Sequence, residues 1–394
     1  MNINFSLAAT AEPEVARPGV NLLTALFGLL LVTGVMTGCY AFIAGHEHVY
    51  NNTREMPWGI LISTYAFFAI TSTGLCLLAA ISHVFGGNRL APLGNRLVWG
   101  SIITIMSAFA VIGFEIENPH RMLLYNVISP NLTSNIWWMG TLYGLAVGFM
   151  LVEFWLILTK QFKMAVILGV GGALAEVAAN TCLGGVFATL PSRPFWYGGM
   201  LPVYFLSCAF LSGAAMAIIF NHAAVAIRKR DFETAEFEGI QTAGKILLLM
   251  LILVSVGTFW RMVSFYVGGT YEGRLAADAL LTGPLSSNFK LFEISIGLVG
   301  PILILVMSRL KSVPAMSAAA LMAIVGMFFA RYDMVVAGQL VPMFLGYDNL
   351  PNYLEYSPSI GEILVVLGGI GLTGSAFLLG ERFFGKIFKA ETHH

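Results

Sequence analysis

Residues 114–140 read FEIENPHRMLLYNVISPNLTSNIWWMG, a polar and aromatic stretch between two long apolar runs. One run, 93–114, ends where the stretch begins, and the next, 134–159, starts before the stretch is finished. A helix that crosses a bilayer needs about 20 mostly apolar residues, and both runs are long enough. The stretch is therefore read as the connection between two membrane-spanning helices.

The composition of the whole chain points to the same class of protein. Its 394 residues are 57% hydrophobic and only 11% charged, and the mean hydropathy is +0.80. A soluble domain carries roughly a quarter charged residues, so this surface is too poor in charge to face water everywhere. The net charge is zero, so the composition gives no indication of a basic surface that would bind nucleic acid. Residues 1–19 lack a basic start followed by an apolar core, so we expect no cleaved signal peptide there.

A scan for apolar runs of this length predicts an all-α polytopic membrane protein with about ten spanning helices. The expected spans are 20–43, 57–85, 93–114, 134–159, 163–188, 195–227, 241–268, 286–309, 313–338 and 358–381. Strands are excluded, because the runs are too long and lack period-two alternation. We expect two four-helix bundles, one within 20–188 and built from the second to fifth helices, the other within 195–381. Residues 1–19 and 382–394 are expected to be cytoplasmic ends.

Lysine and arginine predict the orientation, because they concentrate on the cytoplasmic side of a membrane protein. One side would hold both termini and the connections after the second, fourth, sixth and eighth helices. That side carries 14 of the 21 basic residues, so we place both termini in the cytoplasm, with the protein in the inner membrane of a bacterial or archaeal cell. The outer side carries the long connections, which either bind a partner or are plain solvated loops: 44–56, 115–133, 269–285 and 339–357.

Charged residues inside the second set of helices form one group of interest. Charge in a bilayer core is costly, and such residues usually face the bundle interior with a partner. Counted from the helix ends, five of them fall in the outer third of the membrane: Arg261, Glu293, Arg331, Asp333 and Glu362. We expect a buried charge network, which is either an ion-paired structural clasp or a proton path.

The first set of helices carries a second group of polar and aromatic residues. Glu115 closes the third helix, and Glu176 and Asn180 lie on the fifth, at a depth that we expect to be similar. Glu153 lies toward the inner end of the fourth helix. The aromatic members near the outer ends are Trp58, Tyr65, Trp137, Trp138 and Tyr143. An interfacial aromatic belt explains most tryptophans at helix ends. Aromatic walls with a few convergent polar groups also describe a pocket for a flat, partly apolar ligand.

Metal and haem ligands are poorly represented. The four cysteines lie inside apolar runs without a C-x-x-C pair: Cys39, Cys76, Cys182 and Cys208. We therefore expect no metal site and no iron–sulfur cluster in this chain. A membrane haem usually takes two histidines from facing helices, and His83 with His222 is the one candidate pair. Nothing in their spacing supports it, so we expect no haem.

The opening stretch resembles a signature of the NrfD/PsrC family, the membrane subunits of polysulfide-reductase-like complexes. Members tend to close the third helix with an acidic residue, followed by a basic residue, a proline and an arginine. Here the matching residues are Glu115, Pro119 and Arg121, with Asn118 in place of the basic residue.

Further motifs follow in order along the chain. PWGILISTYAFFAITSTG from Pro57, SHVFGGNRLAPL from Ser82, GFMLVEF and WYGGMLPVYFLSCAF resemble the long subgroup of DsrP and HybB. HybB-type members also place like residues at Arg261, Glu293, Arg331 and Glu362. Some relatives carry a histidine near Ala179, for which Glu176, one turn earlier, is the alternative here.

The resemblance implies a function. Family members bind a quinone, menaquinone or ubiquinone, in a four-helix bundle near the outer face. They exchange electrons with a ferredoxin-like iron–sulfur subunit, which serves a catalytic or cytochrome c subunit. On this basis Glu115 or Glu176 would exchange protons with the quinol. A carboxylic acid in a dry, apolar site can exchange protons near neutral pH. The residues expected around the quinone are Trp58, Tyr65, Asn118, Arg121, Trp137, Trp138, Tyr143 and Asn180. Glu153 is assigned with the second network to a proton path or structural role.

Two other classes of function compete with this one. A secondary transporter would need internal repeats and helices broken near the midplane. The glycine pairs 171–172 and 368–369 are the places where such breaks would fall. The other alternative is a non-catalytic membrane anchor of a redox complex, against which the buried carboxylates argue.

Overall fold

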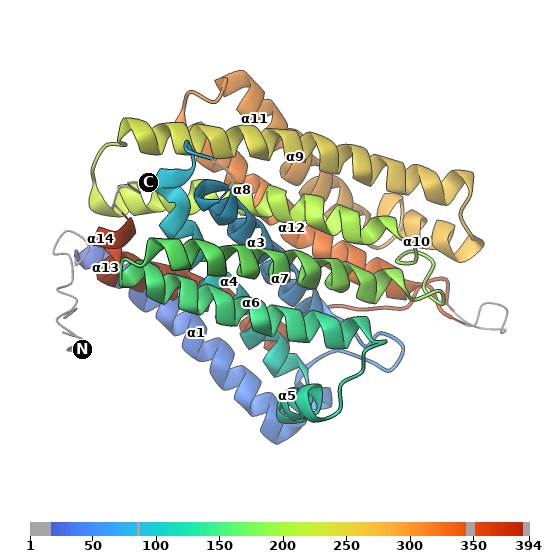
Figure 1. The fold of residues 1–394 in the computed structure, drawn as a ribbon. Coiled ribbons are helices and arrows are strands. Elements are labelled where there is room, and N and C mark those ends of the chain that lie inside the picture. Colours follow the sequence, from blue (N-terminus) through green and yellow to red (C-terminus); the bar gives the residue numbers. More distant parts are fainter. Residues whose placement is uncertain (1–16, 85–86, 344–350, 389–394) are drawn as a thin grey trace.

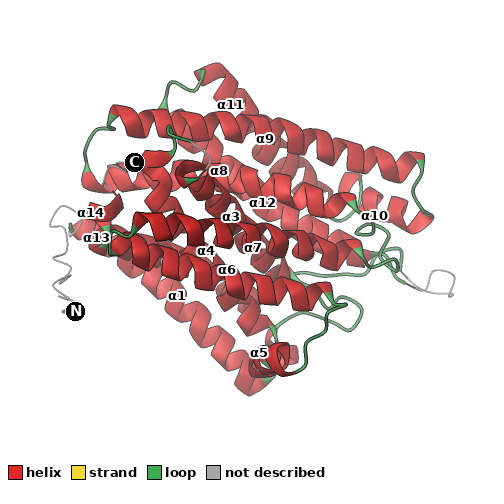
Figure 2. Ribbon diagram, viewed as in Figure 1, coloured by secondary structure: helices red, strands yellow, loops and turns green. Residues whose placement is uncertain are grey.

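The computed structural model describes residues 17–84, 87–343 and 351–388, and within these ranges every regular element is a helix (Figure 2). Ten of the described helices are long and apolar enough to cross a membrane, which confirms the predicted all-α, multi-pass fold. The spanning elements are α1 Pro18–Ala44, α3 Ile60–His83, α4 Gly94–Glu115, α6 Asn135–Leu158, α7 Phe162–Ala188, α8 Met200–Arg228, α9 Thr234–Val267, η2 Asn288–Val299 continued by α11 Gly300–Ser308, α12 Val313–Leu340 and α13 Ile360–Phe383. The short elements are α2 His46–Val49, η1 Ala91–Leu93, α5 Pro119–Ile128, α10 Tyr271–Leu281 and α14 Gly385–Phe388.

The spanning helices run side by side between two faces of the molecule (Figure 1). The start of α1 and the short helix α14 lie at one face, which we call the inner face, and α5 and α10 lie at the opposite, outer face. The described part of the chain therefore begins and ends on one side, as the even number of its spans requires. The assignment of the termini to the cytoplasm stays a prediction.

Eight of the ten spans form two four-helix rings. In the first bundle, α3 contacts α4 and α7, and α6 closes the ring by contacting the same two helices. In the second bundle, α8 contacts α9 and α12, and the η2–α11 span closes the ring in the same way. The remaining helices, α1 and α13, pair with each other and lie against α4 of the first bundle.

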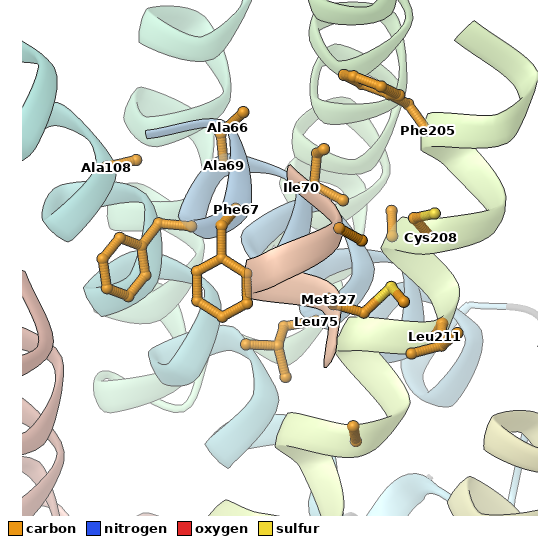
Figure 3. Packing of buried hydrophobic residues seen from close by; sticks show 14 of the residues in the cluster. Ala66, Phe67, Ala69, Ile70, Leu75, Ala108, Phe205, Cys208, Leu211 and Met327 are labelled. Carbon is orange, nitrogen blue, oxygen red and sulfur yellow. The ribbon is translucent and has the colours of Figure 1, made fainter. Parts of the chain in front are cut away.

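The two bundles meet where α3 crosses α8. Gly74 of α3 and Gly213 of α8 face each other, and a Cβ on Gly74 would overlap the Ala209 carbonyl. Small residues allow helix backbones to approach closely in a membrane, where no hydrophobic force drives helices together. Around this crossing, Figure 3 shows apolar side chains of several helices in contact, with Cys208 of α8 and Met327 of α12 among them.

The glycine pairs do not break their helices. Gly171 and Gly172 lie inside the continuous α7, and Gly368 lies inside the continuous α13, where it packs against Gly34 of α1. The irregular span is instead the eighth, which starts as a π-helix at Asn288–Val299. π-Helical turns are rare and often occur at functional sites.

Candidate functional site

A cavity of about 1020 Å³ opens at the outer face, beside the ends of α3 and α12. Its walls come from the segment before α3, the outer end of α12 and the loops on either side of them. The polar and aromatic lining residues include Tyr50, Asn52, Asn288, Tyr332, Tyr353 and Tyr356. Ligand sites of small molecules typically measure 300–1,000 Å³, so this cavity has room for an aromatic headgroup.

Glu115 and Asn52 meet at the edge of this cavity. The Asn52 amide donates to Glu115 Oε1 at 2.7 Å, and this bond fixes which end of the amide faces the carboxylate. The other two oxygens, Glu115 Oε2 and Asn52 Oδ1, are buried and have no hydrogen-bond partner among the described residues. Both atoms are acceptors. Buried polar groups are nearly always paired, so two neighbouring acceptors left open indicate a donor from outside the chain.

Two tyrosines and Glu362 support this region. Tyr50 donates to the Phe114 carbonyl at 3.2 Å, and Tyr356 donates to Glu362 Oε1 at 2.6 Å. Burial, together with the nearby carboxylates of Glu115 and Glu362, raises the pKa of the Tyr50 hydroxyl. Burial and Glu362 likewise raise the pKa of Tyr356. Both hydroxyls therefore stay protonated as donors at neutral pH.

Glu362 was expected in the second-bundle charge network, and the structure corrects this. Its Oε2 accepts from the backbone N–H groups of Ser359, at 2.7 Å, and Asn51, at 3.2 Å. The first of these bonds belongs to a capping box at the start of α13. Since α13 packs on the first bundle, its first turn lies beside the outer cavity.

Glu176 is the centre of a separate polar cluster inside the first bundle. It is fully buried and accepts from Ser72 at 3.0 Å and from Thr73 at 2.7 Å, both on α3. Asn180 and Tyr143 are fully buried in the same bundle. The Tyr143 hydroxyl and both amide atoms of Asn180 lack a hydrogen-bond partner within the part of the chain that the structure describes.

The two carboxylates of the first bundle lie at different depths, which corrects the expectation that they are level. Ser72 bonds both Glu176 and Ser101 of α4, so these residues share one depth. Glu115 lies 14 residues further along α4, which is about 21 Å at 1.5 Å per residue. Glu176 therefore lies near the middle of the membrane, while Glu115 lies at its outer edge.

The tryptophans near the outer face have structural partners. Trp137 donates to the Asn126 carbonyl at 2.8 Å and Trp138 to the Leu132 carbonyl at 2.9 Å, so both hold the α5 region onto α6. Trp58 stacks on Trp196 with ring centroids 5.3 Å apart. Asn118 and Arg121, at the start of α5, are exposed. Tyr65 is buried on α3, two turns outward of Ser72.

The second bundle does bring four of its expected charges together. Arg261 lies over the Phe195 ring and Arg331 over the Phe205 ring, and Tyr204 is close to both. Glu293 and Asp333 lie close enough to Arg261 for their carboxyl groups to interact with its charge. In the described ranges, Glu293 Oε2, Arg331 Nη1 and both Asp333 oxygens are buried without a hydrogen bond.

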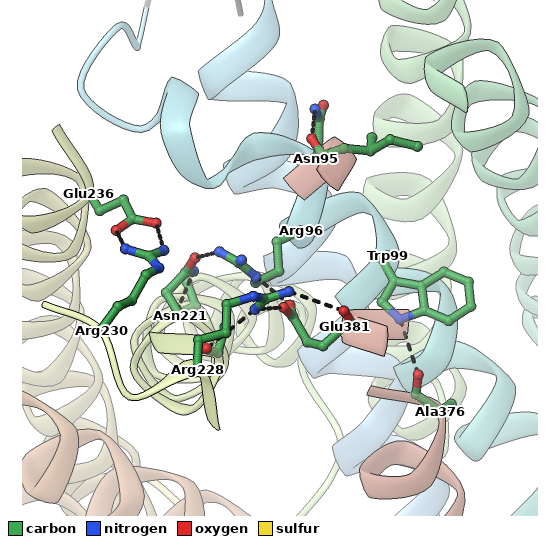
Figure 4. Close-up of polar contacts among 12 residues, drawn as sticks. Asn95, Arg96, Trp99, Asn221, Arg228, Arg230, Glu236, Ala376 and Glu381 are labelled. Carbon is green, nitrogen blue, oxygen red and sulfur yellow. Dashed lines mark hydrogen bonds and ion pairs between the residues drawn. The ribbon is translucent and has the colours of Figure 1, made fainter. Parts of the chain in front are cut away.

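A charged cluster near the inner face escaped the sequence reasoning. Glu381 of α13 accepts from Arg96 of α4 at 2.6 Å and also from Arg228 of α8 (Figure 4). Arg96 donates in addition to Asn221 of α8. Arg96 and Arg228 are among the 14 basic residues counted on the inner side, and both side chains are buried.

The two histidines that were considered as a haem pair, His83 and His222, have different partners on different helices. His83 faces Glu153 of α6, with 3.8 Å between Nδ1 and Oε1. His222 instead bonds the Ser317 hydroxyl of α12 at 2.6 Å. Glu153 thus belongs with His83 at the inner end of the first bundle.

Curated proteins that are similar to this chain include two that match most of its length and one that matches a shorter part. The Hdr-like menaquinol oxidoreductase integral membrane subunit of Archaeoglobus fulgidus is 22% identical over 383 residues, 92% of this chain and 93% of that protein. A selenate reductase subunit of Mesobacillus selenatarsenatis is 22% identical over 376 residues, 80% of this chain and 84% of its own length. Protein NrfD of Escherichia coli is 33% identical over 162 residues, 40% of this chain and 48% of that protein.

A family model extends this similarity across both bundles. The model described as "Polysulphide reductase, NrfD" matches residues 48–343, from the end of α2 to the residues that follow α12. Because the match takes in well over half of the sequence, this chain belongs to the NrfD family of membrane proteins.

Proposed function

We propose that this chain is the quinone-binding membrane subunit of a respiratory oxidoreductase complex. Two relatives similar over most of their length are named as subunits of a menaquinol oxidoreductase and of a selenate reductase. The proposal places this chain in the same kind of assembly, where it exchanges electrons between a membrane quinol and an iron–sulfur partner. Within the family we assign it to the long subgroup of DsrP and HybB, on the motifs at Pro57 and Ser82.

One observation carries the proposal: the two open acceptors beside the outer cavity. A quinol headgroup is flat, aromatic and offers two O–H donors. Glu115 Oε2 and Asn52 Oδ1 accept hydrogen bonds and have no partner in the described chain. Tyrosine rings line the adjacent cavity, which is large enough for the ring. Menaquinol and ubiquinol both present this chemistry.

The chemistry follows from the position of Glu115. Oxidation of a quinol releases two electrons and two protons. The Glu115 carboxylate lies where it can take one proton from a hydroxyl, while Asn52 holds the headgroup through its amide oxygen. The second proton passes to water in the cavity, which opens at the outer face. The electrons leave to an iron–sulfur cluster of a ferredoxin-like subunit docked on the outer loops, and from there to a catalytic or cytochrome c subunit. In the reverse direction, Glu115 supplies the proton.

The other expected quinone ligands have altered roles in this scheme. Trp58 stands behind the cavity, where its backbone N–H and carbonyl are held by the Gln339 side chain at 3.1 and 2.8 Å. Trp137 and Trp138 fix α5, and the exposed Asn118 and Arg121 are available to a docked partner. Tyr65, Tyr143, Glu176 and Asn180 form a polar column inside the bundle, beneath the outer face.

The test uses the complex purified from its native membrane, with quinol-driven reduction of the bound iron–sulfur clusters as the readout. Glu115→Gln should lower this rate at least about 100-fold, because a positioned proton acceptor contributes 10²–10⁴ to rate. Glu117→Gln, an exposed carboxylate two residues away, is the matched control and should leave the rate unchanged. A Glu115→Gln complex that assembles and turns over like wild type would refute the site.

For the second-bundle cluster, the open atoms favour a hydrated proton route over a tight clasp. A clasp pairs its charges directly, whereas Glu293, Asp333 and Arg331 each keep buried atoms without partners in the described structure. Glu293→Gln should abolish proton release coupled to turnover and preserve electron transfer. Failure of this variant to assemble would instead support the clasp.

A further inference from the structure

A cavity of about 880 Å³ opens at the inner face, beside the connection between α6 and α7. One wall is His83, the last residue of α3, and the rest is formed by residues between 160 and 166. Binding sites for small molecules measure about 300–1,000 Å³, so the cavity has room for a ligand. Its lining shares no described residue with the outer cavity, and the proposed quinone chemistry makes no use of it.

The cavity presents positive charge and no described negative charge. Lys160 and Lys163 line it, and the described lining residues include no carboxylate. Within the described ranges, neither lysine belongs to an ion pair. His83 has a buried Nε2 without a hydrogen-bond partner among the described residues, and its Nδ1 lies 3.8 Å from Glu153, whose side chain is 5% exposed. The lysines are therefore available to an anion from outside the chain.

The backbone holds both lysines at a tight connection. Lys160 has a left-handed conformation, with a φ of 59°, and its N–H donates to the Ile157 carbonyl at 3.1 Å. The next N–H, that of Gln161, donates to the Leu156 carbonyl at 2.8 Å. Helix α7 begins at the following residue and takes in Lys163. The two lysines are thus attached to a turn that is fixed by its own hydrogen bonds.

The first turn of α7 adds backbone donors at the same place. Gln161 is the N-cap of this 27-residue helix and makes no side-chain cap bond. Phe162, Lys163 and Met164 are the first three residues of the helix, and all three line the cavity. The first N–H groups of a helix have no partner inside the helix, and its dipole favours negative charge at this end. Such a helix end adds to the attraction that the lysines exert on an anion.

Apolar side chains share the cavity with the lysines and continue into the membrane. Phe162, Met164 and Val166 line it. Ile167 and Leu174 follow Met164 by three and ten residues, which places all three on one side of α7. They are 61%, 67% and 51% exposed, respectively. From Met164 to Leu174 the track measures about 15 Å, which is half of the roughly 30 Å hydrocarbon core. The site therefore has a basic end at the membrane surface and an apolar track as long as one leaflet.

We propose that this cavity binds the phosphate of an anionic phospholipid from the inner leaflet. The phosphate would lie between Lys160 and Lys163 at the first turn of α7, with an acyl chain along Met164, Ile167 and Leu174. A soluble acidic partner would leave this apolar track unused. The inner face is the side that we predict to be cytoplasmic, and the cytoplasmic leaflet carries anionic lipids. The inference does not depend on the proposed quinone function, because no quinol takes part in it.

A lipid in this place has a consequence for the stability of the fold. His83 belongs to α3, whereas Lys160 lies in the connection after α6 and Lys163 in α7. A lipid among them joins three helices of the first bundle at their inner ends. A ligand that binds the folded chain but not the unfolded chain stabilises the fold by mass action. Anionic phospholipid should therefore raise the resistance of the purified chain to a denaturing detergent.

The experiment titrates phosphatidylglycerol or phosphatidylcholine into the full chain, purified in a neutral detergent, and counts the bound lipids by native mass spectrometry. Wild type should bind one phosphatidylglycerol about tenfold more tightly than phosphatidylcholine, because only the first carries net charge. A basic side chain near an anionic headgroup contributes about fivefold to binding, so Lys160→Gln with Lys163→Gln should weaken phosphatidylglycerol binding about 25-fold. The matched control, Lys229→Gln with Lys311→Gln, removes the same charge from two other exposed lysines of the inner connections and should bind like wild type.

The proposal fails if wild type binds the two lipids equally, or if the variant of Lys160 and Lys163 binds phosphatidylglycerol like wild type. An equal loss in the control would show attraction to the net charge of the face and would also overturn it. Inorganic phosphate is the separate probe for a free anion. If phosphate alone raises the unfolding midpoint as much as phosphatidylglycerol does, the lipid assignment is wrong. Should the lysine variant not fold, Gln161→Glu adds a negative charge to the cavity wall, and unchanged phosphatidylglycerol binding by that variant refutes the site.

Discussion

Removal of the Glu381 carboxylate should destabilise the whole membrane domain from its inner end. Glu381 is fully buried and joins α13 to two other helices, through Arg96 of α4 and Arg228 of α8 (Figure 4). In Glu381→Gln one charged acceptor is lost, and the new NH₂ group faces guanidinium donors. Arg96, which is 1% exposed, would then lack the carboxylate that it pairs with.

The size of the effect follows from burial. Loss of one partner from a buried ion pair costs about 3–5 kcal/mol, because the remaining charge stays desolvated. Glutamine keeps one carbonyl acceptor for Arg96, so we expect about 3 kcal/mol. This is a large part of the roughly 5–15 kcal/mol by which a folded protein is stable.

Unfolding of the purified chain in mixed micelles, titrated with a denaturing detergent, measures this difference. Glu238→Gln removes an exposed carboxylate from the same face and should change the free energy of unfolding by no more than about 0.5 kcal/mol. Replacement of Glu381, Arg96 and Arg228 together by methionine should recover most of the stability, because apolar residues of similar volume often match a buried ionic cluster. A Glu381→Gln chain within 1 kcal/mol of wild type, as judged against the ~3–5 kcal/mol expected, would refute the reasoning.

Three further changes test other parts of the structure. Gly74→Leu places a side chain against the α8 backbone and should prevent the folded chain from accumulating in membranes, as measured by size-exclusion chromatography. The control is Gly148→Leu, at a position where a Cβ meets nothing within 4 Å, and this variant should accumulate normally. Trp137→Phe removes the 2.8 Å bond to α5 and should speed amide hydrogen exchange in α5 without changing quinol turnover; lost turnover with unchanged exchange would return this residue to the quinone site. Tyr356→Phe removes a hydroxyl that donates to Glu362 and accepts from a backbone N–H, so it should cost about 1–3 kcal/mol in the same unfolding titration, and an unchanged midpoint would contradict this.

The spanning helices were predictable because the bilayer imposes its own length on them. A run of about 20 apolar residues has few alternatives to a helix when its backbone must be satisfied internally. The predicted ends of the helices were less accurate where a capping motif sets the first residue of the helix. The seventh span was expected from 241, but α9 begins at Thr234, because Glu233 and Glu236 form a capping box seven residues earlier. The usual signature of a capping box is Ser, Thr, Asp or Asn three places before Glu. Glu233 departs from it, so the sequence pattern does not reveal this helix start.

The same signature explains the misplacement of Glu362. Ser359 and Glu362 are three residues apart, the spacing of a capping box, and the structure shows both of its bonds. Depth counted from helix ends placed Glu362 level with Arg261, Glu293 and Arg331, but it gave no information on which bundle α13 joins. Glu115 is conspicuous in the sequence, because it is a carboxylate at a helix end. Asn52 was missed, because an asparagine in a polar loop has no distinguishing pattern.

The inner ionic cluster was hidden by a rule that is otherwise correct. Arg96 and Arg228 do lie toward the inner face, as the distribution of basic residues predicts. Their burial depends on Glu381, a carboxylate that comes from α13, far away in the sequence. The local sequence does not predict such an ion pair, because the pair forms only where three helices pack together.

Helix α13 lies outside the family match, which ends at residue 343, yet it contributes to both ends of the molecule. Glu362 in its first turn orders Tyr356 and the Asn51 backbone at the outer cavity, and Glu381 in its last turn binds α4 and α8. These residues are 19 positions apart, about 28 Å along the helix, close to the thickness of the hydrocarbon core. The helix therefore acts as a brace: its inner end fixes the two bundles relative to each other, and its outer end shapes the wall next to Asn52 and Glu115. Stability should depend chiefly on the inner contact and quinol affinity on the outer one, because the two ends touch different groups of the chain.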